Sequence, residues 1–349
     1  MAHERESAVT EALVRIWQSV LERSPILEGD NFFNIGGDPS RAVRLFDEIA
    51  KVFGQELPTP VIYHAPTITD LASIMQKPVL PKFSPLIPLR AGEAEPPVFL
   101  AHGLGGSVME FFSLAEKLQT SHPIYGLQAI GPDGGDVSFQ TVEDAAKFYV
   151  EAIRERQPRG PYHLIGFSFG GLVVLEIAQR LSSAGETIGL LAMLDAYPFQ
   201  KFLTPMQRVE LVLCLLRYHA SNLKRLPIRR AVSYVLRSAE RTAYSTRKGV
   251  RNFVRVPFSG STLQALESAN LALTRYQPRP YSGKVVFVAA AAKSVFPANP
   301  AAVWKRWMKG FGAETMPGDH YGMLSENSDC LASILSRVLY AASLGKCKS

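Results

Sequence analysis

Hydrophobic positions follow two different periods along the chain. In the first 77 residues, apolar side chains recur at helical spacing, with Val9, Leu13, Ile16, Trp17 and Val20 on one face of a predicted helix. Further short amphipathic helices are predicted at residues 42–52 and 68–75. Short helices in a segment of this length predict a small all-α bundle, which we place at residues 1–77.

Downstream, short apolar runs rich in β-branched and aromatic residues alternate with helical stretches. The predicted strands are residues 98–101, 124–127, 162–167, 188–194 and 285–288, and helices are predicted at 142–156 and 170–182. This alternation predicts an α/β domain over residues 89–345, with a mainly parallel sheet covered by helices on both faces. Between residues 205 and 260 the strands give way to basic helical segments, which predicts a helical lid inserted between late strands.

A proline-rich segment separates the two patterns. Residues 77–88 read KPVLPKFSPLIP, with four prolines in twelve residues. Proline at this density favours an extended, semi-rigid spacer over helix or central strand. We therefore predict a linker at residues 78–88.

Composition narrows the classes of protein. The chain has 349 residues, 47% of them hydrophobic and 20% charged, which is enough apolar mass for a globular core. Its longest apolar run, residues 285–292, is far too short to span a bilayer, and the charged N-terminus shows no secretory signal. The three cysteines are scattered without a C-x-x-C pair. We expect no membrane association, no disulfide framework, no metal site and a cytoplasmic location.

Charge is unevenly distributed. Residues 1–77 carry seven Lys or Arg against eleven Asp or Glu, whereas residues 205–260 carry twelve against two. A basic block suggests an anionic partner, and since this block lies inside the predicted lid of an enzyme fold, we expect no nucleic acid partner. We hypothesise that the acidic small domain, or another acidic domain of its kind, docks on the basic lid. The alternative is that the basic helices form a solvated face.

The strongest chemical motif is GFSFGG at residues 166–171. It is G-x-S-x-G between a predicted strand and a predicted helix, the context in which such a serine is held exposed on a sharp turn. The helix N-terminus behind the serine favours developing negative charge. We therefore predict Ser168 to be a nucleophile.

A serine hydroxyl needs an imidazole base. Of the seven histidines, His320 in the segment MPGDHYGML follows a short apolar stretch and precedes the last predicted helix, where the chain order Ser, Asp, His places the base. The acid is found by elimination. In many hydrolases of this kind the acid follows the first strand after the lid. Residues 268–313, which contain that place, have no Asp or Glu. Asp195 lies at the carboxyl end of a predicted strand, and we predict that it orients His320.

An oxyanion requires two donors. One is expected to be the backbone N–H of Phe169, directly after the nucleophile. The other is expected from the glycine-rich loop HGLGG at residues 102–106, as the backbone N–H of Leu104. His102 itself is expected to brace that loop.

The motifs HGLGG, GFSFGG, MLDAYP and PGDHYGML resemble, in order and spacing, the type I thioesterases of nonribosomal peptide and polyketide assembly lines, members of the α/β-hydrolase superfamily. In that family the acid typically follows the strand before the lid, which agrees with Asp195. Residues 30–38, DNFFNIGGD, resemble the signature of a peptidyl or acyl carrier domain, and PTI at 66–68 matches its closing helix. The resemblance covers nearly the whole chain.

The carrier resemblance breaks at one position. The family signature continues from GGD into the serine that carries 4′-phosphopantetheine, but this chain has Pro39 there and Ser40 next. Ser40 would be displaced by about 100° around a helix and roughly 1.5 Å along it. Two interpretations follow: a phosphopantetheinyl transferase loads Ser40, or the domain is not loaded and serves as a docking module while a partner carrier bears the cofactor.

The resemblance implies a serine thioesterase that releases an acyl or peptidyl chain from a phosphopantetheine carrier, through an acyl-Ser168 intermediate, by hydrolysis or cyclisation in secondary-metabolite biosynthesis. Its expected partners are carrier domains of a synthase. Two alternatives remain: a general carboxylester hydrolase with the same triad, and a non-catalytic docking protein for assembly-line partners.

Overall fold

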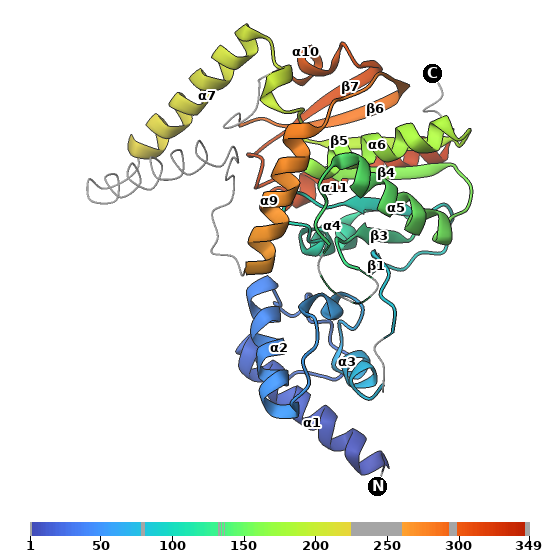
Figure 1. Ribbon diagram of the computed structural model, residues 1–349, viewed down its shortest axis with the longest axis vertical. Coiled ribbons are helices and arrows are strands. Elements are labelled where there is room, and N and C mark those ends of the chain that lie inside the picture. Colours follow the sequence, from blue (N-terminus) through green and yellow to red (C-terminus); the bar gives the residue numbers. More distant parts are fainter. Residues whose placement is uncertain are drawn as a thin grey trace.

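The N-terminal region folds as a bundle of short helices. The computed structural model describes residues 2–77, 81–131, 133, 135, 137–224, 260–292 and 299–345. The bundle contains α1 (Ala2–Leu21), α2 (Pro39–Phe53), the 3-10 helix η1 (Thr59–Tyr63) and α3 (Ile68–Met75) (Figure 1). Its core is formed by fully buried side chains that include Leu13, Trp17, Leu45 and Ile49. The helical spacing of the apolar residues in α1 thus gives one buried face.

Capping residues set the ends of α2. The Asp38 carboxylate accepts a hydrogen bond from the Arg41 backbone N–H at 2.9 Å, and Pro39 is the first helical residue. Proline suits that position because its missing N–H would have no partner within the helix. Gly54 ends α2 in the left-handed conformation, with φ 64°.

The second region is built on one seven-stranded sheet in the order β1-β3-β2-β4-β5-β6-β7. Only β1 runs antiparallel to its neighbour; the other pairs are parallel. The strands are β1 (Leu86–Arg90), β2 (Val98–Ala101), β3 (Ile124–Leu127), β4 (Tyr162–Phe167), β5 (Ile188–Leu194), β6 (Tyr281–Ala290) and β7 (Met308–Met316).

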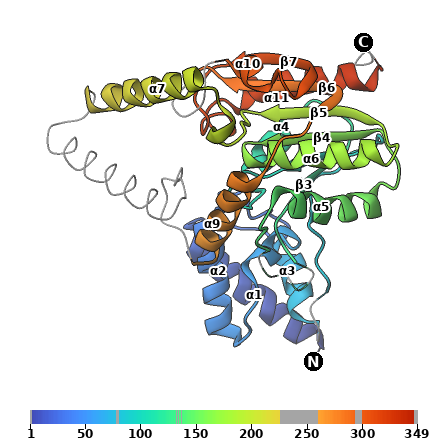
Figure 2. The ribbon, with the colours of Figure 1, turned by 45° about the horizontal axis from the view of Figure 1, so that its top comes forward.

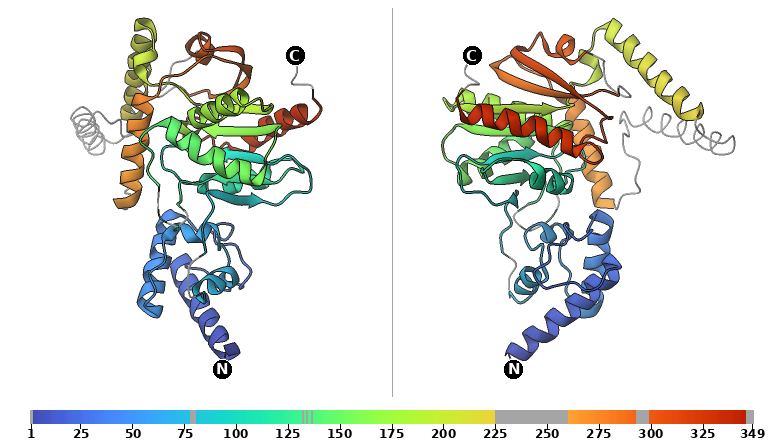
Figure 3. Two further views of the ribbon diagram at one scale, coloured as in Figure 1. Left: turned by 45° about the vertical axis from the view of Figure 1, so that its right-hand side comes forward. Right: turned by 180° about the vertical axis from the view of Figure 1, so that it is seen from behind.

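Helices cover both faces of the sheet (Figures 2 and 3). The helices α5 (Val142–Arg156) and α6 (Phe169–Ser183) pack on one face, where Tyr149, Leu164 and Leu172 share a core. The helices α4 (Phe112–Lys117) and α11 (Ser328–Ser343) pack on the other, with Leu100, Ile165 and Leu335. Shorter elements are η2 (Met109–Phe111), η3 (Gln200–Phe202) and α10 (Pro300–Trp304). The predicted fold class, an α/β-hydrolase sheet preceded by a helical bundle, is confirmed.

Two helices mark the insertion predicted as a lid. The helix α7 (Pro205–Lys224) extends away from the sheet domain. The helix α9 (Gly260–Arg275) runs along the side of the sheet domain towards the helical bundle (Figure 1). Residues 225–259, which hold most of the predicted basic block, lie outside the described residues. The hypothesis of charge-driven docking on that block therefore stays a prediction. Within the described ranges, no helix combines the length and apolar character needed to cross a bilayer.

The helical bundle lies beside the β1 end of the sheet (Figures 1 and 3). The strand β1 begins at Leu86, inside the segment predicted as a linker, so the spacer is shorter than its proline pattern indicates. Pro88 fits this strand because β1 is an edge strand, where a missing N–H costs little.

Candidate active site

Ser168 occupies the turn between β4 and α6. Its backbone has φ 55° and ψ −117°, a strained conformation for a non-glycine residue. The Ser168 N–H donates to the Leu194 carbonyl at 2.9 Å, which ties the turn to the end of β5. The strain is thus held in place by the neighbouring strand, and the hydroxyl projects from the turn towards His320.

The glycines of the motif are required by close backbone approach. A Cβ on Gly166 would lie 2.2 Å from the Gly170 carbonyl oxygen, and a Cβ on Gly170 would lie 2.3 Å from the Ala101 carbonyl oxygen. Any side chain at either position would force the turn apart. The pattern G-x-S-x-G is therefore a packing requirement of this strand–turn–helix unit.

The three side chains predicted as a triad meet at the carboxyl ends of the strands. His320 Nδ1 lies 2.9 Å from Asp195 Oδ2, and His320 Nε2 lies 3.1 Å from Ser168 Oγ. Because a carboxylate only accepts, the Nδ1–H donates to Asp195, which leaves Nε2 free of a proton and able to accept from the serine hydroxyl. The arrangement is that of a serine nucleophile and its base.

Asp195 is held by two strands. It directly follows β5 with φ 45°, and its own N–H donates to the Val288 carbonyl of β6 at 2.8 Å. Its Oδ1 accepts from the Ala290 N–H at 3.2 Å, while Oδ2 faces the imidazole. The strand after the lid, β6, has no acidic residue at its carboxyl end. It instead contributes the Ala290 N–H, which fixes the orientation of the Asp195 carboxylate.

Two neighbours of His320 were not predicted from the sequence. The ring of Phe167 stacks on the imidazole, with centroids 4.7 Å apart and planes at 21°. The carboxyl of Glu110 interacts electrostatically with His320: desolvation raises the pKa of Glu110, and the imidazole opposes that rise. Phe167 could have been found as the residue before the nucleophile, whereas no motif distinguishes Glu110.

The predicted oxyanion loop comes close to the nucleophile at Gly103. A Cβ on Gly103 would be 4.0 Å from the Ser168 Cβ. Leu104 follows Gly103 in the chain, and Phe169, the first residue of α6, follows the serine. His102 is buried behind the loop, between the Gly103 carbonyl at 2.6 Å from Nδ1 and the Tyr149 hydroxyl at 2.7 Å from Nε2. The carbonyl only accepts, so Nδ1 donates to it and Tyr149 donates to Nε2. This agrees with the bracing role expected of His102.

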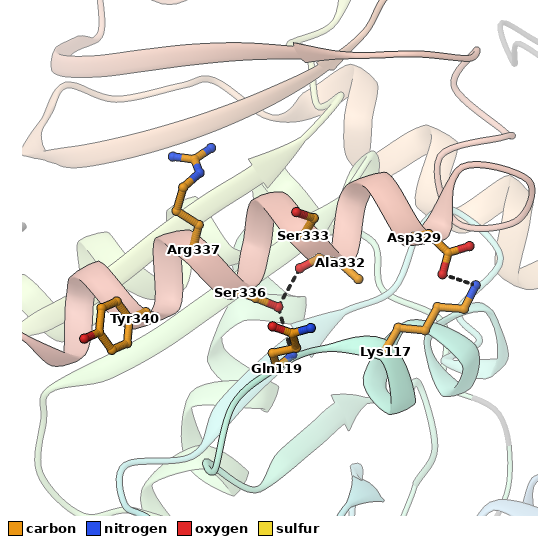
Figure 4. Close-up of a pocket in the computed structure, with 8 residues that line it drawn as sticks. All are labelled: Lys117, Gln119, Asp329, Ala332, Ser333, Ser336, Arg337 and Tyr340. Carbon is orange, nitrogen blue, oxygen red and sulfur yellow. Dashed lines mark hydrogen bonds and ion pairs between the residues drawn. The ribbon is translucent and has the colours of Figure 1, made fainter.

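A groove between α4 and α11 contains none of these residues (Figure 4). There Lys117 pairs with Asp329 at 3.0 Å and donates to the Ser328 hydroxyl at 2.8 Å. The Ser336 hydroxyl accepts from the Gln119 N–H and donates to the Ala332 carbonyl. These polar groups satisfy one another, so we interpret the groove as part of the packing between the two helices.

The fold and the site together define an α/β-hydrolase with a Ser–His–Asp arrangement. The family model described as the thioesterase domain matches residues 96–242, and that described as the phosphopantetheine attachment site matches residues 11–74. The chain therefore contains a thioesterase domain, with a phosphopantetheine-attachment domain in front of it.

Curated relatives are large synthases. The dimodular nonribosomal peptide synthase of Bacillus subtilis (strain 168) is 38% identical over 189 residues, 54% of this chain and 8% of that protein. The indigoidine synthase of Dickeya dadantii (strain 3937) is 35% identical over 176 residues, 50% of this chain and 12% of that protein. The chain thus spans only a small part of the length of the curated relatives it matches.

Solved structures agree with the fold of both regions. One is a four-domain nonribosomal peptide synthetase in its holo form, bound to AMP and glycine. The match covers 94% of this chain and 26% of the synthetase, at a TM-score of 0.55 and 22% identity. Another is the type II thioesterase BorB from the borrelidin biosynthetic cluster. That match covers 73% of this chain and 96% of BorB, at a TM-score of 0.50 and 18% identity.

The attachment domain has a hydroxyl one residue after the expected place. Pro39, the first residue of α2, has no group to modify, whereas Ser40 is exposed in the same helical turn. Arg41, which follows, donates its guanidinium to the Gly36 carbonyl at 2.6 Å and leaves the serine uncovered. Of the two residues that follow Asp38, Ser40 is the one with a hydroxyl that could be modified.

Two buried histidines predict a pH dependence of stability. Burial lowers the pKa of His102 and of His163 to about 4. The unfolded chain, with histidine pKa values near 6.5, binds more protons between pH 6.5 and 4, so stability should be lost as the pH falls through this window, by about 1 kcal/mol per pH unit for each histidine. The free energy of unfolding, measured with denaturant at pH 6 and at pH 5, should fall by about 1 kcal/mol less over this pH unit in His163→Gln than in the unaltered protein. Equal slopes would contradict the prediction.

Proposed function

We propose that this chain is a serine thioesterase that releases an acyl or peptidyl chain from a phosphopantetheine carrier in nonribosomal peptide or polyketide biosynthesis. The observation that supports this most directly is the contact of Ser168, His320 and Asp195 at 3.1 and 2.9 Å beside a glycine-rich loop. The relative from Bacillus subtilis, a dimodular nonribosomal peptide synthase with a far longer chain, supports the context.

The first half-reaction forms an ester on Ser168. Its Oγ attacks the carbonyl carbon of the thioester while His320 Nε2 takes the hydroxyl proton. Asp195 stabilises the imidazolium that results, and the backbone N–H groups of Leu104 and Phe169 donate to the oxyanion. Collapse of the tetrahedral intermediate breaks the C–S bond, and the leaving sulfur takes the proton from His320, so that the thiol departs and the imidazole is neutral again.

The second half-reaction releases the chain. Water, or a hydroxyl or amine within the acyl group, attacks the ester carbonyl while His320 again takes the proton, which it then returns to Ser168 Oγ. Attack by water gives an acid, and attack from within the chain gives a lactone or lactam. Exclusion of water from the acyl-enzyme would favour cyclisation over hydrolysis.

The test compares two substrates with the same acyl group, a pantetheine thioester and a p-nitrophenyl ester. We expect transient acylation of the peptide that contains Ser168, detected by intact-protein and peptide mass spectrometry, and a higher kcat/KM for the thioester. A preference for the ester would support a general carboxylester hydrolase. No acylation, and no labelling of the folded protein by a fluorophosphonate, would support a docking protein without catalysis.

We also propose that Ser40 accepts phosphopantetheine from a transferase and that the chain works in the cytoplasm, with carrier domains of a synthase as its partners. Incubation with coenzyme A and a phosphopantetheinyl transferase should add one phosphopantetheine group, and Ser40→Ala should abolish the addition. Ser24→Ala, which removes another exposed serine of the same domain, is the control. If the unaltered chain gains no mass, the domain is a docking module and the substrate arrives on a partner carrier.

A further inference from the structure

Residues 107–112 of the thioesterase domain contact the attachment domain. The ring of Phe33 stacks on that of Phe112, with centroids 4.3 Å apart and planes at 22°. Phe33 also stacks on Tyr63, at 5.5 Å and 10°, and the Tyr63 hydroxyl lies 2.9 Å from the Ser107 hydroxyl. Phe33 follows the buried Phe32 in the loop before α2, and Tyr63 ends η1, so two separate parts of the attachment domain meet the same segment.

This contact is a packed core rather than a touch between surfaces. Tyr63 and Phe112 are each only 8% exposed. One continuous apolar cluster runs from Trp17 and Phe32, inside the attachment domain, to Phe111 and Phe112 and on to the face of the sheet beneath α11. Aromatic stacks of this geometry favour a single relative placement of the two rings. The attachment domain is therefore fixed on the thioesterase domain through this cluster.

The same segment borders the catalytic groups. Ser107 directly follows Gly106, the last residue of the glycine-rich loop over Ser168, and the Gly106 carbonyl accepts from the Ala129 N–H at 3.2 Å. Glu110, between Ser107 and Phe112, interacts electrostatically with the imidazole of His320. This segment thus contacts the attachment domain through Ser107 and Phe112, and it continues the chain directly from the oxyanion loop.

We propose that Phe33 and Tyr63 are positioning residues of the thioesterase site: the docked attachment domain holds residues 107–112, and through them the oxyanion loop and Glu110, in the geometry that the reaction needs. The attachment domain then has a role in catalysis that is separate from delivery of the acyl chain. This inference rests on the proposed function, and it holds whether or not Ser40 is loaded.

The consequence is measurable with a substrate that needs no carrier. Displacement of oxyanion donors by a fraction of an ångström weakens bonds made in the transition state and leaves ground-state binding nearly unchanged. For a free pantetheine thioester we expect Phe33→Ala to lower kcat about tenfold, with KM changed less than twofold. Phe33→Tyr keeps the ring and should retain more than half of the activity.

Two features separate positioning from loss of folding. The concentration of active sites is measured by titrating Ser168 with a fluorophosphonate, and kcat is calculated from that concentration. Unfolded protein therefore does not lower the measured kcat. The double variant Phe33→Ala with Phe112→Ala should be no slower than the slower single variant, because both changes break the same stack. Val52→Ala, an exposed apolar residue at the far end of α2, is the matched control and should be unchanged.

The rate constant of fluorophosphonate labelling is the second measurement, since it depends on the serine, the imidazole and the oxyanion donors without a thioester. We expect Phe33→Ala to slow labelling about tenfold. If labelling and kcat per active site equal those of the unaltered protein, the attachment domain is only a tether and the inference is wrong. If the unaltered protein is labelled but turns over no thioester, the proposed function fails, and the labelling rates alone decide this inference.

Discussion

Replacing Ser168 by alanine should abolish thioester turnover, with a loss in kcat on the order of 10⁴- to 10⁶-fold. The hydroxyl removed is the atom that lies 3.1 Å from His320 Nε2, the nitrogen that would take its proton. The residual rate reflects water attack helped by the oxyanion donors and by substrate binding. Steady-state release of free thiol, followed with a thiol reagent, measures the loss.

The control for this variant is Ser333→Ala. Ser333 is an exposed serine of α11 that borders the groove of Figure 4, outside the triad. It should retain full activity and full fluorophosphonate labelling, whereas Ser168→Ala should lose both and stay folded. Turnover that persists in Ser168→Ala would mean that water attacks the thioester directly, without an acyl-enzyme intermediate.

How far the sequence predicts the fold depends on where each strand lies. The four strands between residues 98 and 194 occur at the predicted residues, because strands inside a parallel sheet are buried on both faces and read as apolar runs. The strands β1 and β7 escaped prediction, and these are the two edges of the sheet. β1 contains a proline, and β7 is exposed along much of its length and contains two glycines, so neither shows the apolar signal of a central strand.

The site was more predictable than its surroundings. Nucleophile, base and acid each stand at a characteristic point of the chain, and the lack of Asp or Glu in residues 268–313 left Asp195 as the acid. The structure brings these three side chains into hydrogen-bond contact. The contact of Phe33 with Phe112 could not be predicted, because an aromatic residue that packs across domains has the same pattern as one that packs within its own.

Replacing Asp195 by asparagine should lower kcat about 10⁴-fold without unfolding the protein. An asparagine carbonyl in the place of Oδ1 keeps the hydrogen bond from the Ala290 N–H, and the amide NH₂ then faces His320 Nδ1. Since that NH₂ only donates, the imidazole must accept at Nδ1 and carry its proton on Nε2. In this tautomer Nε2 cannot take the proton of Ser168, so the nucleophile is present but not activated.

The neighbouring carboxylate supplies the matched control for Asp195→Asn. Asp319 precedes His320, and its Oδ1 accepts from the Gly322 N–H at 2.8 Å, a bond that an asparagine carbonyl retains. Asp319→Asn should therefore stay within about twofold of the unaltered kcat. Because the loss in Asp195→Asn arises from the imidazole tautomer, it should appear equally in kcat for the thioester and in the rate of fluorophosphonate labelling. A larger loss in Asp319→Asn than in Asp195→Asn would reverse the assignment of the acid.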